Sequence, residues 1–333
     1  MAKSAFVLFG STGSLAKEKI IPAINSLYKK GDLENIEIIF YARREVEIDA
    51  NYHFIKGELN DLSGISDFLK KENIDRVFFY VSLPPTLYPE IINSISKMDE
   101  DLEKVIALEK PFGTSLKNAQ ALAVQLKLIP NSKIYLVDHY LAKEPIIDLT
   151  KQDITKIKNI KIAILETVDV AERGEFFDSL GMIKDVGQNH MLNILSKVVG
   201  SLNKIHYKKG SLELAQYKDY LETKGVRENS QTETYFKADF VLEGTYMDIE
   251  FIAGKMQKEI SVFLNIEYLD GSEYKIQIKP PDKPFSKEAH EYIIEDIIGG
   301  KEKFAVPVEE ALKAWKIIEE VLEDKANTKI EKY

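Results

Sequence analysis

The feature that most constrains the fold of this chain is a regular alternation of apolar and amphipathic segments over residues 1–138. Near-continuous apolar runs predict strands at Ser4–Gly10, Ile36–Ala42, Val77–Leu83, Lys104–Leu108 and Lys133–Val137, with a weaker one near His53–Lys56. Segments with helical periodicity separate them, at Leu15–Lys30, Leu62–Asn73, Leu87–Lys97 and Ser115–Leu128. Strands that are apolar on both faces are typical of a parallel sheet covered by helices on both sides. The pattern therefore predicts a doubly wound α/β domain.

The pattern changes after Asp138. Helices are predicted at Glu144–Lys151 and Met182–Val199, with a strand at Ile160–Val168 between them. Four β-rich runs then follow one another, at Thr232–Leu242, Met247–Ile252, Glu259–Tyr268 and Ser272–Ile278. Asp270-Gly271, between the last two runs, is a hairpin signal. Two helices, near Lys287–Ile298 and Val308–Asp324, complete the pattern. Strands without intervening helices predict a largely antiparallel sheet, hence an α+β domain. We expect a dinucleotide-binding domain over residues 1–138 and a substrate-binding, catalytic domain over residues 139–333.

A glycine-containing turn joins the first predicted strand to the first predicted helix. It reads Gly10-Ser11-Thr12-Gly13-Ser14-Leu15-Ala16. Glycines at this place let the backbone approach a pyrophosphate, and the helix N-terminus offers oriented N–H groups to the anion. The spacing is GxxGxxA and differs from the usual GxGxxG, so a tight turn without a ligand is the alternative. Its position after the first strand is the one that a Rossmann-type fingerprint requires.

The second predicted strand is followed by Arg43-Arg44. An NAD-specific enzyme typically carries Asp or Glu at this point for the ribose hydroxyls, whereas Arg accommodates the 2′-phosphate of NADP. The arginine pair therefore favours NADP, with NAD still possible. A solvated pair of surface arginines is the alternative interpretation.

Composition excludes several classes of protein. The chain has no cysteine, which rules out disulfides, thiolate catalysis and a zinc–thiolate centre. A net charge of −9 opposes general nucleic-acid binding, although a phosphorylated substrate needs only a few well-placed cations. No apolar run is long enough to span a membrane, and the first residues lack the features of a signal peptide. We expect a cytoplasmic protein with no membrane or nucleic-acid partner.

Three further segments are more specific. They are Glu109-Lys110-Pro111-Phe112-Gly113, Asp138-His139-Tyr140-Leu141-Ala142-Lys143-Glu144 and Asp185-Val186-Gly187-Gln188-Asn189-His190. With the glycine turn, their order and spacing resemble the glucose-6-phosphate dehydrogenase family over nearly the whole chain. Glu-Lys-Pro also occurs in Gfo/Idh/MocA oxidoreductases, which share the two-domain plan, but the other two segments favour the first family. The resemblance implies NADP-dependent oxidation of glucose 6-phosphate at its anomeric carbon to 6-phosphoglucono-1,5-lactone, in carbohydrate metabolism and the pentose phosphate pathway.

This reaction requires a base near neutral pH, because a hydroxyl proton leaves as hydride passes to nicotinamide. His190 lies in a polar cluster near the start of a predicted helix, and an imidazole is a base at physiological pH. A carboxylate on the other ring nitrogen would orient it. The resemblance assigns that role to Asp138. The alternative for His190 is a hydrogen-bonded structural histidine. Three other histidines lie in no comparable cluster and are expected to be structural or on the surface, namely His53, His206 and His290.

The resemblance also implies a set of substrate-binding residues. The predicted phosphate ligands are His139, Tyr140 and Lys143. The predicted ligands of the sugar are Glu166, Asp185 and Lys255. On a helix, residues 139 and 143 would project from one face, although ordinary surface residues share that spacing. A surface acid and a helix cap are the alternatives for Glu166 and Asp185.

Three more positions match residues that lie near cofactor and substrate in the family. Lys110 and Pro111 correspond to its Lys-Pro pair, and a lysine there could act on both ligands. Lys19 corresponds to a lysine near both ligands, and a solvent-facing lysine is its alternative.

The chain also departs from the family pattern. It is considerably shorter, with the losses falling between Arg44 and Phe54, after His190 and after Lys255. The family's Gly-Asp is Gly13-Ser14 here, and Ala142 replaces a glycine. The resemblance implies a homo-oligomer, namely a dimer. Because the chain is shortened, its oligomeric state and the identity of its sugar substrate are left open. The rivals are a dehydrogenase of another sugar or sugar phosphate and a non-catalytic sugar-phosphate-binding regulator. We expect no metal, since no acidic or histidine cluster has ligand spacing.

Overall fold

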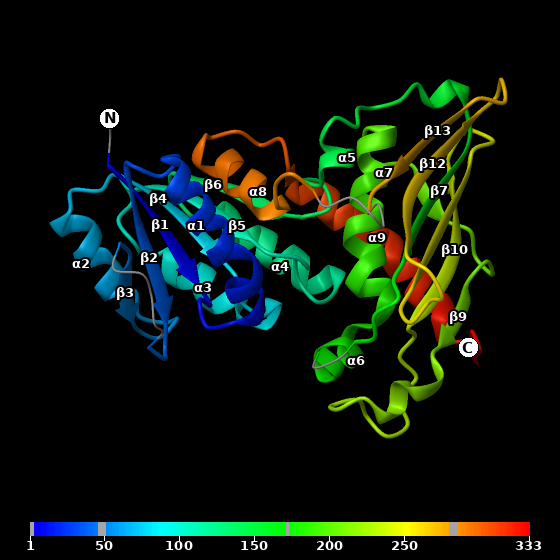
Figure 1. The fold of residues 1–333 in the computed structure, drawn as a ribbon, viewed down its shortest axis with the longest axis horizontal. Helices are drawn as coiled ribbons and strands as arrows, with labels where there is room; N and C mark the ends of the chain where they lie inside the picture. The colour runs from blue at the N-terminus through cyan, green and yellow to red at the C-terminus, as the bar shows by residue number, and fades with distance from the viewer. Residues whose placement is uncertain (1–2, 46–50, 171–172, 280–284) are drawn as a thin grey trace. The chain divides into compact units, whose positions relative to one another are not determined.

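The computed structural model describes residues 3–45, 51–170, 173–279 and 285–333, and the chain divides into two compact units (Figure 1). Unit 1 comprises Met1–Ala142 and Lys287–Val308, and unit 2 comprises Lys143–Ser286 and Glu309–Tyr333. The division differs from the expected boundary at residue 138 in one main respect. The segment Lys287–Val308 belongs to unit 1, so the second predicted domain is not continuous in sequence. The reason is that this segment packs its helix on the first sheet's helical layer.

Unit 1 is built on a sheet whose strand order is β14-β6-β5-β4-β1-β2-β3. Its strands are β1 (Ser4–Phe9), β2 (Ile36–Ala42), β3 (His53–Lys56), β4 (Arg76–Val81), β5 (Glu103–Leu108), β6 (Ser132–Val137) and β14 (Ala305–Val306). All neighbours are parallel except β14, which runs antiparallel to β6. The strand order reverses between β1 and β4. The predicted doubly wound domain is confirmed.

Helices cover both faces of this sheet. They are η1 (Ala16–Ile20), α1 (Ile21–Lys30), α2 (Ser63–Lys71), η2 (Pro85–Leu87), α3 (Tyr88–Ile95), α4 (Leu116–Lys127) and α8 (Ala289–Ile298). Helix α1 packs against α8, and α3 against α4. Because parallel crossovers are right-handed, reversing the strand order at β1 puts the helices of the two halves on opposite faces. The strands between them are buried on both sides, which explains their unbroken apolar sequence.

Unit 2 contains a second sheet, of order β13-β12-β7-β11-β10-β9-β15, with β8 paired to β10. Its strands are β7 (Ile157–Leu165), β8 (Ile205–Tyr207), β9 (Glu213–Gln216), β10 (Tyr235–Leu242), β11 (Asp248–Gly254), β12 (Ser261–Tyr268), β13 (Glu273–Gln277) and β15 (Ile330–Lys332). Most neighbours are antiparallel, as predicted, but β7–β11 and β9–β15 are parallel. The hairpin at Asp270-Gly271 is confirmed, since the Tyr268 amide donates to the Ser272 carbonyl at 2.9 Å.

The helices of unit 2 differ from prediction at two places. The helices of this unit are α5 (Glu144–Ile147), η3 (Ile154–Lys156), α6 (Gly174–Met182), η5 (Ile183–Met191), α7 (Leu192–Val199), η6 (Lys218–Glu222) and α9 (Val308–Lys325). The helix predicted over Glu144–Lys151 ends at Ile147. The helix predicted over Met182–Val199 is two elements, of which η5 is a π-helix. This π-helix packs on β11, and a Cβ on its Gly187 would lie 3.0 Å from Phe236 of β10 and 3.8 Å from Ile318 of α9.

Among the described residues, no helix combines the length and the apolar character that a membrane span needs.

Candidate functional site

The candidate cofactor residues follow parallel strands of unit 1. Phe9 of β1 is in register with Tyr41 of β2 and with Val81 of β4, and the register continues through Leu108 of β5 to Leu136 of β6. The segments that leave these strands therefore lie along one edge of the sheet. In a doubly wound sheet, ligands bind at this edge, in the crevice where the strand order reverses.

The glycine turn has a geometry that only glycine permits at its first residue. Gly10 has φ +76°, and a Cβ on it would lie 2.1 Å from the Ser82 carbonyl oxygen. The Gly13 amide donates to the Gly10 carbonyl at 2.9 Å, and the Lys17 amide donates to the Gly13 carbonyl at 3.0 Å. These bonds close the turn directly into η1. The backbone of the turn thus passes against β4 and leads into a helix start, as the predicted pyrophosphate site requires.

The side chains of this turn suit a dinucleotide. Ser11 is fully buried, and its hydroxyl has no hydrogen-bond partner within the described part of the chain. Thr12, Gly13 and Ser14 are exposed, and Leu15 is 36% exposed. A buried hydroxyl without a partner, in a turn of exposed residues at a helix start, is an arrangement that a bound phosphate could complete.

Arg43 and Arg44 are exposed immediately after β2. Since Tyr41 and Phe9 are in register, the arginines leave the sheet edge beside the glycine turn. Lys19, on η1, is half exposed and lies 3.7 Å from Glu288. Its predicted role at the ligands stays a prediction. The chain is predicted to lack a segment of the family between Arg44 and Phe54. Residues 46–50 of this stretch lie outside the described residues.

Lys110 and Pro111 follow β5 and are anchored by the residue before them. Glu109 is buried, and its carboxylate accepts from the Tyr80 hydroxyl at 2.6 Å. Its carbonyl accepts from the Tyr88 hydroxyl at 2.5 Å. Two tyrosines from neighbouring elements thus fix the backbone that carries Lys110 to the sheet edge.

Asp138 and its neighbours follow β6 as a turn. The buried Asp138 carboxylate accepts from the Tyr140 amide at 3.0 Å, and its carbonyl accepts from the Leu141 amide at 3.0 Å. The helix begins only at Glu144. The helix thus begins where it was predicted to begin, and His139 and residue 143 precede it, so the shared helix face that their spacing would give does not form; the Asp138 side chain stabilises a turn there. The roles of these residues at a phosphate stay predictions.

Sequence reasoning gave His290 no functional role, but the structure places it beside that turn. Its ring stacks on the ring of His139 with a centroid distance of 6.0 Å. Its Nε2 lies 3.4 Å from the Glu109 carboxylate, and the residue is buried. The sequence carried little signal for this contact, since His290 lies in the first turn of α8, about 150 positions after His139.

Two predicted substrate residues meet in unit 2. Leu165 of β7 and Gly254 of β11 are in register in a parallel pair, so the next residues, Glu166 and Lys255, emerge side by side. Lys255 Nζ lies 2.5 Å from the Glu166 carboxylate, with side chains that are 12% and 20% exposed. The structure therefore brings a largely buried cation and a carboxylate together at the end of the sheet.

Further lysines act on the same carboxylate. Burial raises the pKa of Glu166, but the charges of Lys255, Lys279 and Lys143 outweigh it and lower that pKa below its usual range. Lys143 was among the substrate-binding residues predicted from the sequence, as a ligand of the phosphate. Lys279 was not predicted. Only the register of β13 with β12, and of β12 with β7, shows that the chain after β13 leaves the sheet at the end where Glu166 follows β7.

The predicted base lies on the π-helix of unit 2. His190 is 3% exposed, and its backbone amide donates to the Asn189 side chain at 2.8 Å. Asp185, on the same helix, is also buried and lies 3.6 Å from Arg173. π-Helical turns are frequent at functional sites because they re-aim side chains. Asp138 belongs to unit 1 and His190 to unit 2, and their pairing stays a prediction.

Two sequence models of one family match the chain. "Glucose-6-phosphate dehydrogenase, NAD binding domain" matches residues 7–75 and 51–147, and "Glucose-6-phosphate dehydrogenase, C-terminal domain" matches residues 151–201. Together they cover more than half of the chain in the order of the two units. The chain belongs to the glucose-6-phosphate dehydrogenase family. It is a dehydrogenase with a nicotinamide-dinucleotide-binding domain.

Individual relatives define how this family member diverges. It is 25% identical to "Glucose-6-phosphate 1-dehydrogenase 6, cytoplasmic" of Arabidopsis thaliana over 440 positions, which include 96% of this chain and 85% of the relative. It is 30% identical to the Schizosaccharomyces pombe glucose-6-phosphate 1-dehydrogenase over 242 aligned positions, which include 58% of this chain and 48% of the relative. The first alignment is longer than the chain, so it contains long gaps here. This confirms a shortened, divergent member.

Solved structures agree on the fold. A "Glucose-6-phosphate dehydrogenase in complex with its substrate glucose-6-phosphate" has a TM-score of 0.84 at 22% identity, covering 100% of this chain and 94% of that one. The Mycobacterium avium enzyme gives 0.83 at 20% identity, with the same coverage. The predicted α/β Rossmann-type domain and second, largely antiparallel domain are thus confirmed.

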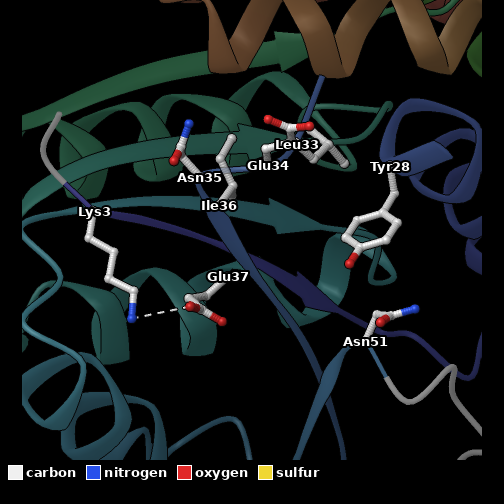
Figure 2. A pocket seen from close by; sticks show the side chains of 8 residues that line it. All are labelled: Lys3, Tyr28, Leu33, Glu34, Asn35, Ile36, Glu37 and Asn51. Carbon is white, nitrogen blue, oxygen red and sulfur yellow. Dashed lines mark ion pairs between the residues drawn. The ribbon is translucent and has the colours of Figure 1, made fainter. Parts of the chain in front are cut away.

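One cavity of this family member lies away from the candidate residues. It measures about 900 Å³ and is lined in part by Lys3, Tyr28, Glu37 and Asn51 (Figure 2). Ser4 and Ile36, in register at the start of β1 and β2, place it at the opposite edge from the glycine turn. Lys3 is paired with Glu37 at 3.2 Å. The cavity is therefore not the predicted cofactor site.

Proposed function

We propose that the protein oxidises D-glucose 6-phosphate with NADP⁺ to 6-phosphoglucono-1,5-lactone and NADPH. The observation that carries this proposal is the ion pair of Lys255 with the largely buried Glu166 at 2.5 Å, in a glucose-6-phosphate dehydrogenase chain where the charges of Lys143 and Lys279 also act on that carboxylate. Several cations next to one ionised carboxylate suit a substrate that joins an anionic phosphate to neutral hydroxyls. The choice of glucose 6-phosphate is supported by the relatives, which are glucose-6-phosphate 1-dehydrogenases, and by the similar structure that holds this sugar phosphate as its substrate.

The mechanism that we propose uses His190 as the base. The chemistry that a bound nicotinamide supplies is acceptance of the hydride from the anomeric carbon. His190 takes the proton of the anomeric hydroxyl, and the carbon–oxygen bond becomes the lactone carbonyl. Asp138 would orient the imidazole and stabilise its charged form. Lys110, fixed by Glu109 and its two tyrosines, would act electrostatically between cofactor and substrate, with Pro111 beside it.

Roles at the substrate follow the same proposal. His139, Tyr140 and Lys143 would bind the phosphate, and Glu166, Asp185 and Lys255 would bind the remainder of the sugar. The 2′-phosphate of NADP would lie at Arg43 and Arg44, which are exposed beside the glycine turn.

The test is a panel of sugars and sugar phosphates assayed by the absorbance of reduced nicotinamide. Glucose 6-phosphate should give the highest kcat/KM, and free glucose should be poor because it lacks the phosphate. Replacing His190 by Asn should remove most of kcat, on the order of 10²- to 10⁴-fold, with little change in substrate affinity. A neutral sugar preferred over every phosphate would overturn the substrate, and an unchanged kcat would overturn the base.

Self-association and location complete the proposal. We propose a homodimer through the outer face of the second sheet, where Tyr235, Ile252 and Phe263 are only partly buried. Light scattering after gel filtration tests it, and a monomer at micromolar concentration would contradict it. A cytoplasmic location is supported by the names of the Arabidopsis and potato relatives, and cell fractionation tests it.

A further inference from the structure

The backbone of Lys255 is held by two side-chain donors. The Tyr333 hydroxyl donates to the Lys255 carbonyl at 2.5 Å. The Gln257 side-chain amide donates to the same carbonyl at 3.0 Å. The Lys255 amide in turn donates to the Thr234 carbonyl at 2.9 Å. Both backbone groups of this one residue are therefore engaged, so the point from which its side chain leaves is held in place.

The chain next to Lys255 needs such support. Met256 has φ +50°, a left-handed conformation that residues other than glycine rarely adopt. Its amide donates to the Val168 carbonyl at 3.1 Å, and the Gln257 amide donates to the Glu166 carbonyl at 2.9 Å. A strained residue persists when the surrounding structure over-determines it, and such residues cluster at ligand sites.

Tyr333 is itself well placed to act as a support. It follows β15, which pairs in parallel with β9. Its amide donates to the Gln216 carbonyl at 3.2 Å, and its carbonyl accepts from the Lys218 amide at 3.1 Å. Its ring lies edge-on to Tyr235 with a centroid distance of 6.0 Å. Because the backbone and the ring are both held, the Tyr333 hydroxyl loses little conformational entropy when it donates to the Lys255 carbonyl.

The hydroxyl keeps its proton over the working range of pH. Burial raises the pKa of Tyr333 above its ordinary value, and a hydroxyl that is protonated can donate. It also lies 3.2 Å from the Thr234 hydroxyl. Tyr333 therefore bridges the start of β10 and the end of β11, the two strands that meet beside Lys255.

We propose that Tyr333 is a positioning residue for substrate binding, which holds the Lys255 backbone so that its ammonium faces Glu166 and the substrate. The inference rests on the proposed function of Lys255 as a substrate-binding cation. No segment of the sequence signalled it, because Tyr333 lies 78 positions from Lys255 and only β15 brings the two together.

The test is Tyr333→Phe, which removes the hydroxyl and keeps the ring on Tyr235. With glucose 6-phosphate and NADP⁺, KM for the sugar phosphate should rise on the order of 2- to 10-fold while kcat and KM for NADP⁺ stay near wild type. Hydrogen exchange of the amides of residues 255–257 should become faster. The control is Tyr268→Phe, which removes a tyrosine hydroxyl that donates to Gln152 at 2.9 Å. Tyr268 pairs with Ile157 at the other end of β7, roughly 25–30 Å from Glu166 at the usual rise per residue.

A double-mutant cycle separates failure of this inference from failure of the proposed function. Lys255→Met should raise KM by itself, and adding Tyr333→Phe to it should raise KM no further. If Lys255→Met raised KM but Tyr333→Phe behaved like Tyr268→Phe, the positioning role would be wrong and the proposed function would stand. An equal effect of Tyr333→Phe with and without Lys255 would likewise overturn the positioning role. If Lys255→Met left KM unchanged, the substrate role of Lys255 would fall, and the inference with it.

Discussion

Glu166 stays ionised although most of its side chain is buried. Taking a carboxylate out of water raises its pKa, and here only the lysines around it reverse that effect. The closest of them, Lys255, lies 2.5 Å away. The pair is therefore interdependent, since removing either charge would leave the other buried without compensation.

This coupling predicts a pH dependence of stability. The folded-state pKa of Glu166 lies below the unfolded value of 4.5, so its contribution is complete above pH 4.5 and is lost as the pH falls through the folded-state pKa. Glu166→Gln should thus be less stable than wild type at pH 7, and the difference should shrink below about pH 4.5. Urea unfolding at several pH values measures it. A difference that stayed constant down to pH 3 would show that this carboxylate does not gain from its lysines.

Arg43 and Arg44 allow a prediction about cofactor choice. Changing both to Ala should lower kcat/KM for NADP⁺ by roughly 10-fold or more, because hydrogen bonds to charged groups are lost. The value for NAD⁺ should change little, since that cofactor lacks the 2′-phosphate. Kinetics with both cofactors provide the measurement. An unchanged ratio would place these arginines in solvent.

Among the elements, the π-helix η5 depends on a glycine and a carboxylate. Gly181 has φ +75° and ψ 171°, outside the helical region. There the chain turns so that the buried Glu233 carboxylate accepts from the Ile183 amide at 3.0 Å. Glu233 also pairs with Lys325 of α9. The start of the helix that carries His190 is thus set by residues from three separate parts of the chain.

Gly181→Ala should therefore destabilise the protein strongly. A Cβ there would lie 2.4 Å from a Glu233 oxygen, and the conformation is one that glycine alone adopts readily, so we expect a loss of roughly 2 kcal/mol or more. Gly244→Ala is the control, because Gly244 also has positive φ but nothing within 4 Å of its Cβ position. It should cost about 1 kcal/mol. Denaturant unfolding compares the two, and equal losses would mean that the contact with Glu233 is unimportant.

The same elements show what sequence could predict. Strands β1, β2, β4, β5 and β6 were predictable because burial on both faces demands unbroken apolar runs. The predicted helix start at Met182 falls directly after the break at Gly181, but helix α6 before that break was not predicted. Strands β8, β9, β14 and β15 were missed because each has two to four residues and forms only through its partners. Lys279, His290 and Tyr333 escaped notice for the same reason, since strand register and packing bring them to their neighbours.

At the scale of the whole molecule, each unit gathers several of its candidate residues at one end of one sheet, whereas Asp185 and His190 lie on the π-helix η5 of unit 2. In unit 1 the parallel register does this for the glycine turn, the arginine pair and the segments beginning at Glu109 and Asp138. In unit 2 the parallel pair β7–β11 does it for Glu166 and Lys255. Three of the family motifs thus follow strands of the first sheet, and the fourth, Asp185–His190, lies on η5.

The central claim is that this member of the family transfers hydride from the anomeric carbon of glucose 6-phosphate to NADP⁺. The most direct test uses glucose 6-phosphate deuterated at that carbon, with mass spectrometry of the nicotinamide product. We predict reduced cofactor that carries one deuterium, together with a lactone or its hydrolysis product that carries none. Reduced cofactor without the label, or no reduction of either nicotinamide cofactor, would contradict the account.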